Sequence, residues 1–150
     1  MKRKMVIGML TMGMVLCGAM TVSAESDGYV ISASHGYGAV EHWEIKTIGM
    51  QDAAKDLGVE FNYKYADGDL QQEVADIENF VEMGTNYIIV GPCNSEGIVP
   101  VIEEAQDKGV AVGTCDIGIE GVDVASFVSS DNYGIGEIAA DYIGTEMNGE

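Results

Sequence analysis

Met83-Gly84-Thr85-Asn86-Tyr87-Ile88-Ile89-Val90, residues 83–90, is a stretch in which a helix-patterned segment stops at a glycine and an apolar run follows at once. The same succession occurs at Leu57-Gly58-Val59 and at Lys108-Gly109-Val110. Glycine just past a helix end adopts the left-handed conformation without a Cβ penalty, so the chain can turn back into a strand. The repeated pattern therefore predicts a parallel α/β domain.

Hydrophobic periodicity extends this prediction to a doubly wound parallel sheet with the strand order 2-1-3-4-5. In the first helix, Ile45, Ile48 and Gly49 share one face, and Asp69 is expected to cap the second helix. The expected strands span residues 29–33, 59–65, 87–90, 110–114 and 124–128. The expected helices span 40–57 and 70–81, then a segment marked by Val101, Ile102 and Ala105 with Pro100 in its first turn, and finally 135–147.

The first 24 residues have the pattern of an export signal. Lys2, Arg3 and Lys4 precede an apolar run, and Val22-Ser23-Ala24 offers small residues for cleavage. The apolar run is short for a membrane span, so a transmembrane anchor is the weaker interpretation. Lipidation at Cys17 is an alternative that the bulky Leu16 disfavours. We expect an exported protein in the periplasm or at the outer face of the cell membrane.

Charge excludes several classes of partner. The formal net charge of −18 becomes −21 without the leader, because three of the seven basic residues lie there, and no arginine remains. Such a surface repels nucleic acid and anionic lipid. The remaining cysteines, Cys93 and Cys115, are expected as free thiols, and no metal or cofactor site is predicted because metal-ligand spacing such as C-x-x-C is absent.

The loops after the first, third and fourth strands carry the functional prediction. Carboxyl ends of parallel strands meet at one edge of the sheet, and ligands bind in the crevice where the winding direction reverses. These loops hold Ser34, His42, the only tryptophan Trp43, Asn94 and Asp116, whereas His35 and Tyr37 are expected as loop residues of undefined access. Aromatic, amide and carboxylate groups together suit a sugar or polyol. Trp43 as a packing residue, Asn94 as a helix cap and Asp116 as a helix cap or turn residue are open alternatives.

At these residues the chain resembles the periplasmic sugar-binding proteins of bacterial ABC importers, in particular the ribose-binding group. The resemblance runs from Tyr29 onward and is most specific at residues 84–92, at Asp116, at Ser130-Asp131-Asn132 and at residues 138–143. It implies two lobes that close on a monosaccharide and a monomer that delivers the ligand to a permease, with no catalytic residue. It also implies that His42 and Trp43 pack on the sugar, that Asp116 accepts its hydroxyls, and that the hinge lies at Ser130, Asp131 and Asn132.

The departures from the ribose pattern argue for a different sugar or a polyol. Ile117 stands where that pattern has an arginine, Gly91 replaces an asparagine, and a further asparagine is replaced near Val40. Each sugar hydroxyl left without a partner costs about 1–3 kcal/mol. The resemblance also implies a fragment, with residues 1–24 as signal peptide, 25–131 as the first lobe, and 132–150 as the hinge exit and first helix of a second lobe that is largely missing.

Two other functions stay open. An extracellular sugar sensor would use the same fold to feed a receptor. A dinucleotide-dependent oxidoreductase is the remote alternative, because Gly36-Tyr37-Gly38-Ala39-Val40-Glu41 imitates a G-x-G-x-x-G loop and Asp67 stands near the end of the second strand. Glu41 puts bulk and negative charge where the third glycine belongs, which disfavours that function.

Overall fold

The computed structural model describes residues 28–38 and 40–147. The predicted signal peptide and Cys17 therefore lie outside the described residues. The strands are β1 (Val30–His35), β2 (Glu60–Tyr65), β3 (Tyr87–Gly91), β4 (Ala111–Cys115) and β5 (Ser126–Val128). The helices are α1 (Glu41–Leu57), α2 (Leu70–Glu82), α3 (Val99–Asp107) and α4 (Asn132–Glu146).

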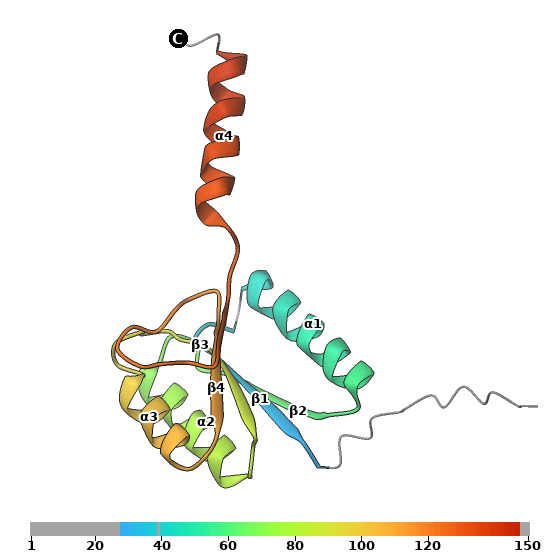
Figure 1. Ribbon diagram of the computed structural model, residues 1–150, viewed down its shortest axis with the longest axis vertical. Helices are drawn as coiled ribbons and strands as arrows, with labels where there is room; N and C mark the ends of the chain where they lie inside the picture. The colour runs from blue at the N-terminus through green and yellow to red at the C-terminus, as the bar shows by residue number, and fades with distance from the viewer. Residues whose placement is uncertain (1–27, 39, 148–150) are drawn as a thin grey trace, which may run out of the picture.

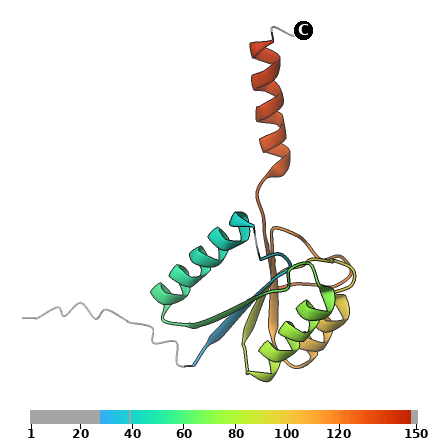
Figure 2. The same cartoon turned by 180° about the vertical axis from the view of Figure 1, so that it is seen from behind.

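The five strands form one sheet in the order β2-β1-β3-β4-β5, and every neighbouring pair is parallel. This confirms the predicted fold class and strand order. Helix α1 covers one face of the sheet, and α2 and α3 cover the other (Figures 1 and 2). The winding direction reverses between β1 and β3, so the loops that follow these two strands start side by side.

The main core lies between the sheet and the α2–α3 layer. Ile88 and Val90 of β3 are completely buried there, and Val112 of β4 is 1 % exposed. In α2, Ile77 lies in the core, and Leu70, Val74 and Val81 pack against it. The full cluster is Ile77, Phe80, Ile88, Val90, Ile98, Val101, Ile102, Ala105, Val110 and Val112.

The helix ends follow the sequence signals. Gly58, Gly84 and Gly109 have φ angles of 68°, 82° and 87°, in the left-handed region that a side chain disfavours. Asp69 caps α2, since its Oδ1 accepts hydrogen bonds from the backbone N–H groups of Gln71 and Gln72 at 2.9 and 3.3 Å. These signals confirm how helices and strands alternate along the chain.

Two details of the prediction were wrong. Ile45 and Ile48 are 62 % and 56 % exposed, so they do not form the packed face of α1. Trp43, Thr47 and Ala54 are buried instead. The phenol of Tyr65 donates to Thr47 Oγ1 at 2.8 Å, and Thr47 Oγ1 donates to the carbonyl of Trp43 at 2.9 Å. The hydrogen bond from Tyr65 holds the Thr47 side of α1 toward β2.

The second error concerns the end of the first strand. β1 continues through Ser34 to His35, which pairs with Tyr65 on one side and Gly91 on the other. His35 is thus a completely buried strand residue and not the loop residue expected from sequence. Backbone pairing to both neighbours extends the strand beyond its apolar part.

Helix α4 projects away from the sheet (Figure 1), and none of its residues is buried. It begins beside the predicted hinge, where Asp131 Oδ1 accepts a hydrogen bond from the backbone N–H of Gly134 at 2.9 Å. Among the described helices, none combines the length and the apolar character that crossing a bilayer requires.

Candidate functional site

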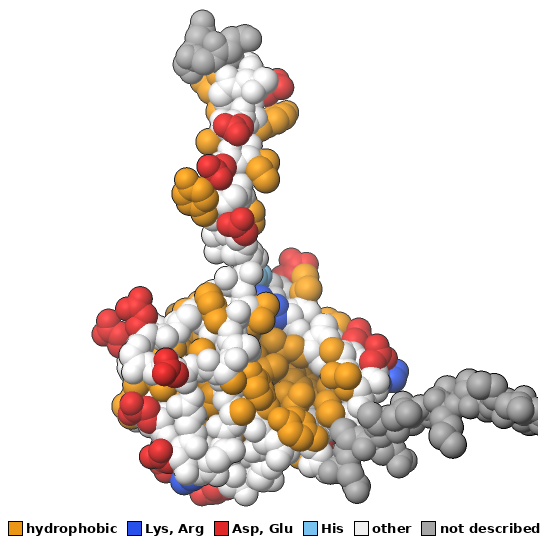
Figure 3. All heavy atoms as spheres, in the orientation of Figure 1, with side chains coloured by type: hydrophobic (Ala, Val, Ile, Leu, Met, Phe, Trp, Pro, Cys, Tyr) orange, Lys and Arg blue, Asp and Glu red, His pale blue; other side chains and the backbone are white. Residues whose placement is uncertain are grey.

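A groove of about 450 Å³ lies at the carboxyl edge of the sheet, between α1 and the ends of β4 and β5. On the face that Figure 3 displays, hydrophobic side chains gather between α1 and the strands, below the base of α4. The groove combines this apolar surface with an ion pair and two serines. Its lining residues are Lys46, Gly49, Met50, Ala53, Cys115, Asp116, Val128, Ser129 and Ser130.

Asp116 is the acidic group of the groove, and α1 supplies both of its partners. Lys46 Nζ lies 3.1 Å from Asp116 Oδ1, and His42 Nε2 lies 3.1 Å from Oδ2. Partial burial alone would raise the pKa of Asp116, but the hydrogen bond from His42 and the ion pair with Lys46 outweigh it, so the pKa lies below its ordinary value. Asp116 therefore offers an ionised carboxylate as a hydrogen-bond acceptor.

Trp43 lies next to this ion pair, but little of its surface is free. The side chain is 4 % exposed, and Lys46 Nζ sits 4.2 Å from the ring centroid in a cation–π contact. A Cβ on Gly91 would lie 2.5 Å from Trp43 Cη2, so the indole occupies the space that a side chain at position 91 would fill. A ligand would reach the indole face only after these covering groups move.

The structure brings only some of the predicted residues together. Asp116 and Ser130 line the groove, and His42 joins them through Asp116. Ser34 is completely buried. Its side chain lies on the face of the sheet that α2 covers, because it is paired with Val90, which belongs to that core. Asn94 Oδ1 accepts from the backbone N–H groups of Glu96 and Gly97 at 3.2 and 2.8 Å, which is the capping geometry that the sequence left open.

Sequence reasoning missed Lys46, and it placed His35 in a loop. Lys46 follows His42 by four residues, a spacing that places both on one side of a helix, so the signal was present. His35 is enclosed by aromatic rings, with centroids 5.2 Å from Trp43 and 5.6 Å from Tyr65. Burial, and then the positive charge of Lys46, lower the pKa of His35 from 6.5 to about 4. The imidazole is therefore neutral.

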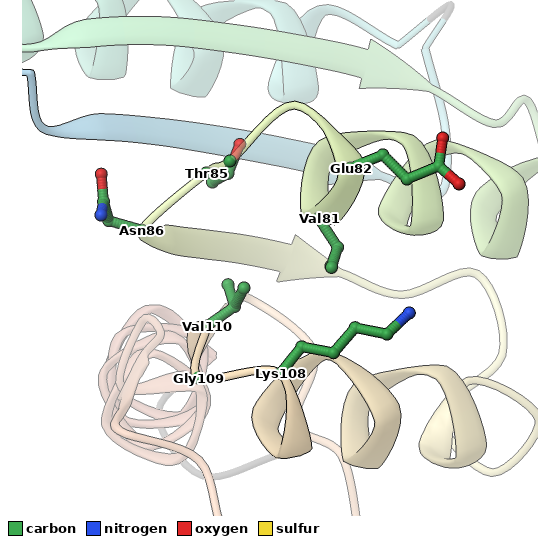
Figure 4. Close-up of a pocket in the computed structure, with 8 residues that line it drawn as sticks. Val81, Glu82, Thr85, Asn86, Lys108, Gly109 and Val110 are labelled. Atoms are coloured by element: carbon green, nitrogen blue, oxygen red, sulfur yellow. The ribbon is translucent and has the colours of Figure 1, made fainter.

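A second hollow lies at the opposite edge of the sheet, at the amino ends of β3 and β4 (Figure 4). Its volume is about 480 Å³, and it is lined by the last turns of α2 and α3. Asn86 Oδ1 already accepts from the backbone N–H of Val30 at 2.8 Å, and Lys108 pairs with Glu104 at 2.7 Å. Since ligands of such sheets bind at the carboxyl edge, we place the site in the groove beside Asp116.

The glycines of the dinucleotide-like loop have packing roles. A Cβ on Gly36 would lie 2.6 Å from Cys93 Cα, and one on Gly38 would lie 2.7 Å from Tyr65 Cβ. The carboxylate of Asp67 accepts from the backbone N–H of Gly38 at 3.2 Å, so it is engaged within the loop. Close packing against these neighbours accounts for both glycines without a bound phosphate.

Cys93 and Cys115, the cysteines among the described residues, are free thiols, as expected. The backbone N–H of Cys93 donates to Glu73 Oε2 at 3.0 Å. Burial, followed by the hydrogen bond and charge of Glu73, raises the pKa of Cys93 to about 12, and burial raises that of Cys115. Neither is a thiolate at neutral pH. Within residues 28–38 and 40–147, no group of three or more His, Cys, Asp or Glu side chains is placed to hold a metal ion.

Comparisons with known proteins agree with this geometry. Residues 36–150 match the family model described as periplasmic binding protein domain. The D-xylose-binding periplasmic protein of Haemophilus influenzae is 30 % identical over 130 residues, covering 85 % of this chain and 39 % of that protein. The ribose import binding protein of Bacillus subtilis is 30 % identical over 99 residues, covering 66 % and 32 %.

Solved structures agree as well. The structure of an ABC transporter solute-binding protein from Clostridium phytofermentans with bound β-D-glucose has a TM-score of 0.74 and 26 % identity, covering 79 % of this chain and 37 % of that chain. The chain thus spans between about a third and two fifths of the length of these proteins.

Proposed function

Because this chain belongs to the periplasmic binding protein family, we propose that it binds a small neutral sugar or polyol outside the cytoplasm for import by an ABC transporter. The observation that carries the proposal is the groove beside Asp116, in which one ionised carboxylate is held at the carboxyl edge of a parallel sheet. Carboxylate oxygens accept hydrogen bonds from hydroxyl groups, and the apolar lining of Met50, Ala53 and Val128 suits C–H surfaces.

The proposed mechanism is closure around the hinge at Ser130, Asp131 and Asn132. In this account the sheet domain binds the ligand first, and a second lobe beyond the hinge covers it and produces the form that a permease recognises. Ser130 lines the groove and Asp131 caps α4, so the connection to α4 starts at the ligand site itself. No catalytic residue, metal or cofactor has a role in this proposal.

Titration followed by ¹⁵N–¹H NMR tests the proposal on the chain itself. D-xylose, D-ribose, D-glucose and xylitol are each added to millimolar concentration, because the groove is open to solvent and a dissociation constant of about 1 mM corresponds to only about 4 kcal/mol. We expect one of these ligands to shift backbone signals at the groove, including those of Asp116 and Ser130.

Two variants localise the response. Asp116→Asn should weaken binding at least about tenfold, because a charged acceptor is lost. Asp52→Asn, an exposed change elsewhere on α1, should leave binding unchanged. Signals that shift at the hollow of Figure 4 instead would refute the site. NAD is titrated in the same way, and a response to NAD alone would favour the oxidoreductase alternative.

A further inference from the structure

Lys46 occupies an unusual position for a lysine. Its side chain is 23 % exposed and its Nζ atom is buried, although lysine ordinarily extends its ammonium into water. The ammonium lies between the Trp43 ring, at 4.2 Å from the centroid, and Asp116 Oδ1, at 3.1 Å. Burying an ammonium is costly unless it is paired, so this placement calls for an explanation beyond a surface ion pair.

His42 completes the arrangement from the same helix. It stands one turn before Lys46 and contacts the other carboxylate oxygen of Asp116 at 3.1 Å. The rings of His42 and Trp43 meet edge to face at 5.6 Å. One oxygen of Asp116 is therefore hydrogen-bonded to His42 and the other is ion-paired with Lys46, both from α1, which leaves lone pairs on each oxygen for further hydrogen bonds.

The backbone of Asp116 is fixed as well. Its φ angle is 67°, in the left-handed region that few residues with side chains adopt, and its N–H donates to the carbonyl of Val128 at 2.8 Å. A residue held in this conformation depends on its surroundings to keep it there. The contacts from α1 and the bond to β5 together fix the direction of the carboxylate.

We propose that Lys46 is a positioning residue of this site: its buried ammonium, held between Trp43 and Asp116, fixes the Asp116 carboxylate as the acceptor for hydroxyl groups of an uncharged ligand. The inference rests on the proposed function. The positive charge beside Asp116 thus comes from Lys46 of α1, because the residue that follows Asp116 in the chain, Ile117, is uncharged.

The charge of the cluster defines the ligand class. The ammonium of Lys46 is already paired with Asp116, and its Nζ is buried, so it does not present a free positive charge to the groove. A ligand carboxylate or phosphate would instead approach the ionised Asp116 in a protein with an excess of acidic residues. Neutral sugars and polyols are therefore favoured over sugar acids such as D-glucuronate.

The first experiment measures Asp116 without any ligand. Its carboxyl ¹³C signal is titrated in the wild type, in Lys46→Met, which keeps an apolar stem on Trp43, and in Lys46→Arg, which keeps the charge. We expect the pKa of Asp116 to rise in Lys46→Met and to return toward the wild-type value in Lys46→Arg. Lys55→Met, an exposed change in the last turn of α1, is the matched control and should leave the pKa of Asp116 as it is.

The second experiment measures how ligand affinity depends on pH, with the sugar that binds the wild type and with D-glucuronate. The titratable groups that face Asp116 are His42 and Lys46 from α1 and the neighbouring Cys115 of β4, while the groove residues from the β5 end, Val128, Ser129 and Ser130, do not titrate. Lys46→Met should weaken binding about tenfold at neutral pH, as expected for a lost charge-assisted contact. Its loss of binding in acid should begin at higher pH than in the wild type.

These outcomes separate the inference from the proposed function. An unchanged Asp116 titration in Lys46→Met, or no recovery in Lys46→Arg, would overturn the positioning role even if sugars bind. If no sugar binds the wild type, the proposed function fails, whereas the ¹³C titration still decides whether Lys46 controls Asp116. Tighter binding of D-glucuronate than of neutral sugars would overturn the ligand class. Lys46→Gln gives a second neutral variant if Lys46→Met does not fold.

Discussion

Replacing His35 by phenylalanine should remove most of the decrease in unfolding free energy between pH 7 and pH 5. His35 is completely buried, and both of its ring nitrogens lack a hydrogen-bond partner among the described residues. Its pKa falls from 6.5 to about 4 because burial, and then the charge of Lys46, disfavour the protonated ring. The unfolded chain therefore takes up a proton at a pH at which the folded chain does not.

The sign and size of the effect follow from that difference. Stability falls as the pH drops below the unfolded value, because the unfolded state binds more protons there. At pH 5 the loss relative to pH 7 is about 2 kcal/mol in unfolding free energy, and it approaches about 3 kcal/mol once the pH reaches the folded value. Glu73 acts with the opposite sign, since burial raises its pKa and its protonation in acid favours folding. The wild type and the His35 variants share Glu73, so their comparison isolates the histidine.

The assay is urea unfolding at pH 7 and pH 5, followed by far-ultraviolet circular dichroism. His35→Phe, which keeps a ring between Trp43 and Tyr65, should lose about 2 kcal/mol less than the wild type between the two pH values. His35→Asn should show the same reduced pH dependence, although its stability at pH 7 will differ, because neither replacement titrates. A wild-type pH dependence in both variants would refute the assignment of the acid sensitivity to His35.

Other substitutions test the remaining features. Gly91→Ala should destabilise the fold by about 1–3 kcal/mol in urea unfolding, because the new Cβ meets the Trp43 ring; stability equal to wild type would show that the indole can move freely. Asp69→Ala should cost about 1 kcal/mol by the same measurement through loss of the α2 cap, whereas Asp69→Asn should cost much less. Between pH 5 and pH 8, the unfolding free energy of Glu73→Gln should rise more than that of the wild type, because the raised pKa of the Glu73 carboxyl destabilises the wild-type fold as pH rises; a pH dependence equal to that of the wild type would contradict the raised pKa of Glu73.

The fold was largely predictable because its signals are local. Glycine at a helix end, an Asx cap and the spacing of apolar residues act within a few residues, and Gly84, Asp69 and Ile77 behave as their patterns indicate. The orientation of α1 was not predictable in this way. Its buried side includes Thr47, whose hydroxyl accepts a hydrogen bond from Tyr65 of β2, and a partner 18 residues away leaves no trace in helical periodicity.

The site was predictable only in part, for a related reason. Asp116 follows a strand directly, so topology alone places it at the carboxyl edge. Lys46 lies in mid-helix, where a lysine usually faces water, and its burial depends on a carboxylate 70 residues later in the chain. The sequence position of Asn94, by contrast, already indicated a capping residue, and its side chain does accept a capping hydrogen bond from the backbone N–H of Gly97.

Trp43 gives the protein an internal optical reporter. It is the only tryptophan in the sequence, and its ring is buried beneath the Lys46 ammonium at the edge of the groove. Displacement of Lys46, entry of water beside the indole, or binding of a ligand to Asp116 would each alter the surroundings of this single tryptophan. Tryptophan emission from the unlabelled chain therefore reports on the surroundings of Trp43, and a change in its wavelength follows such an event in real time.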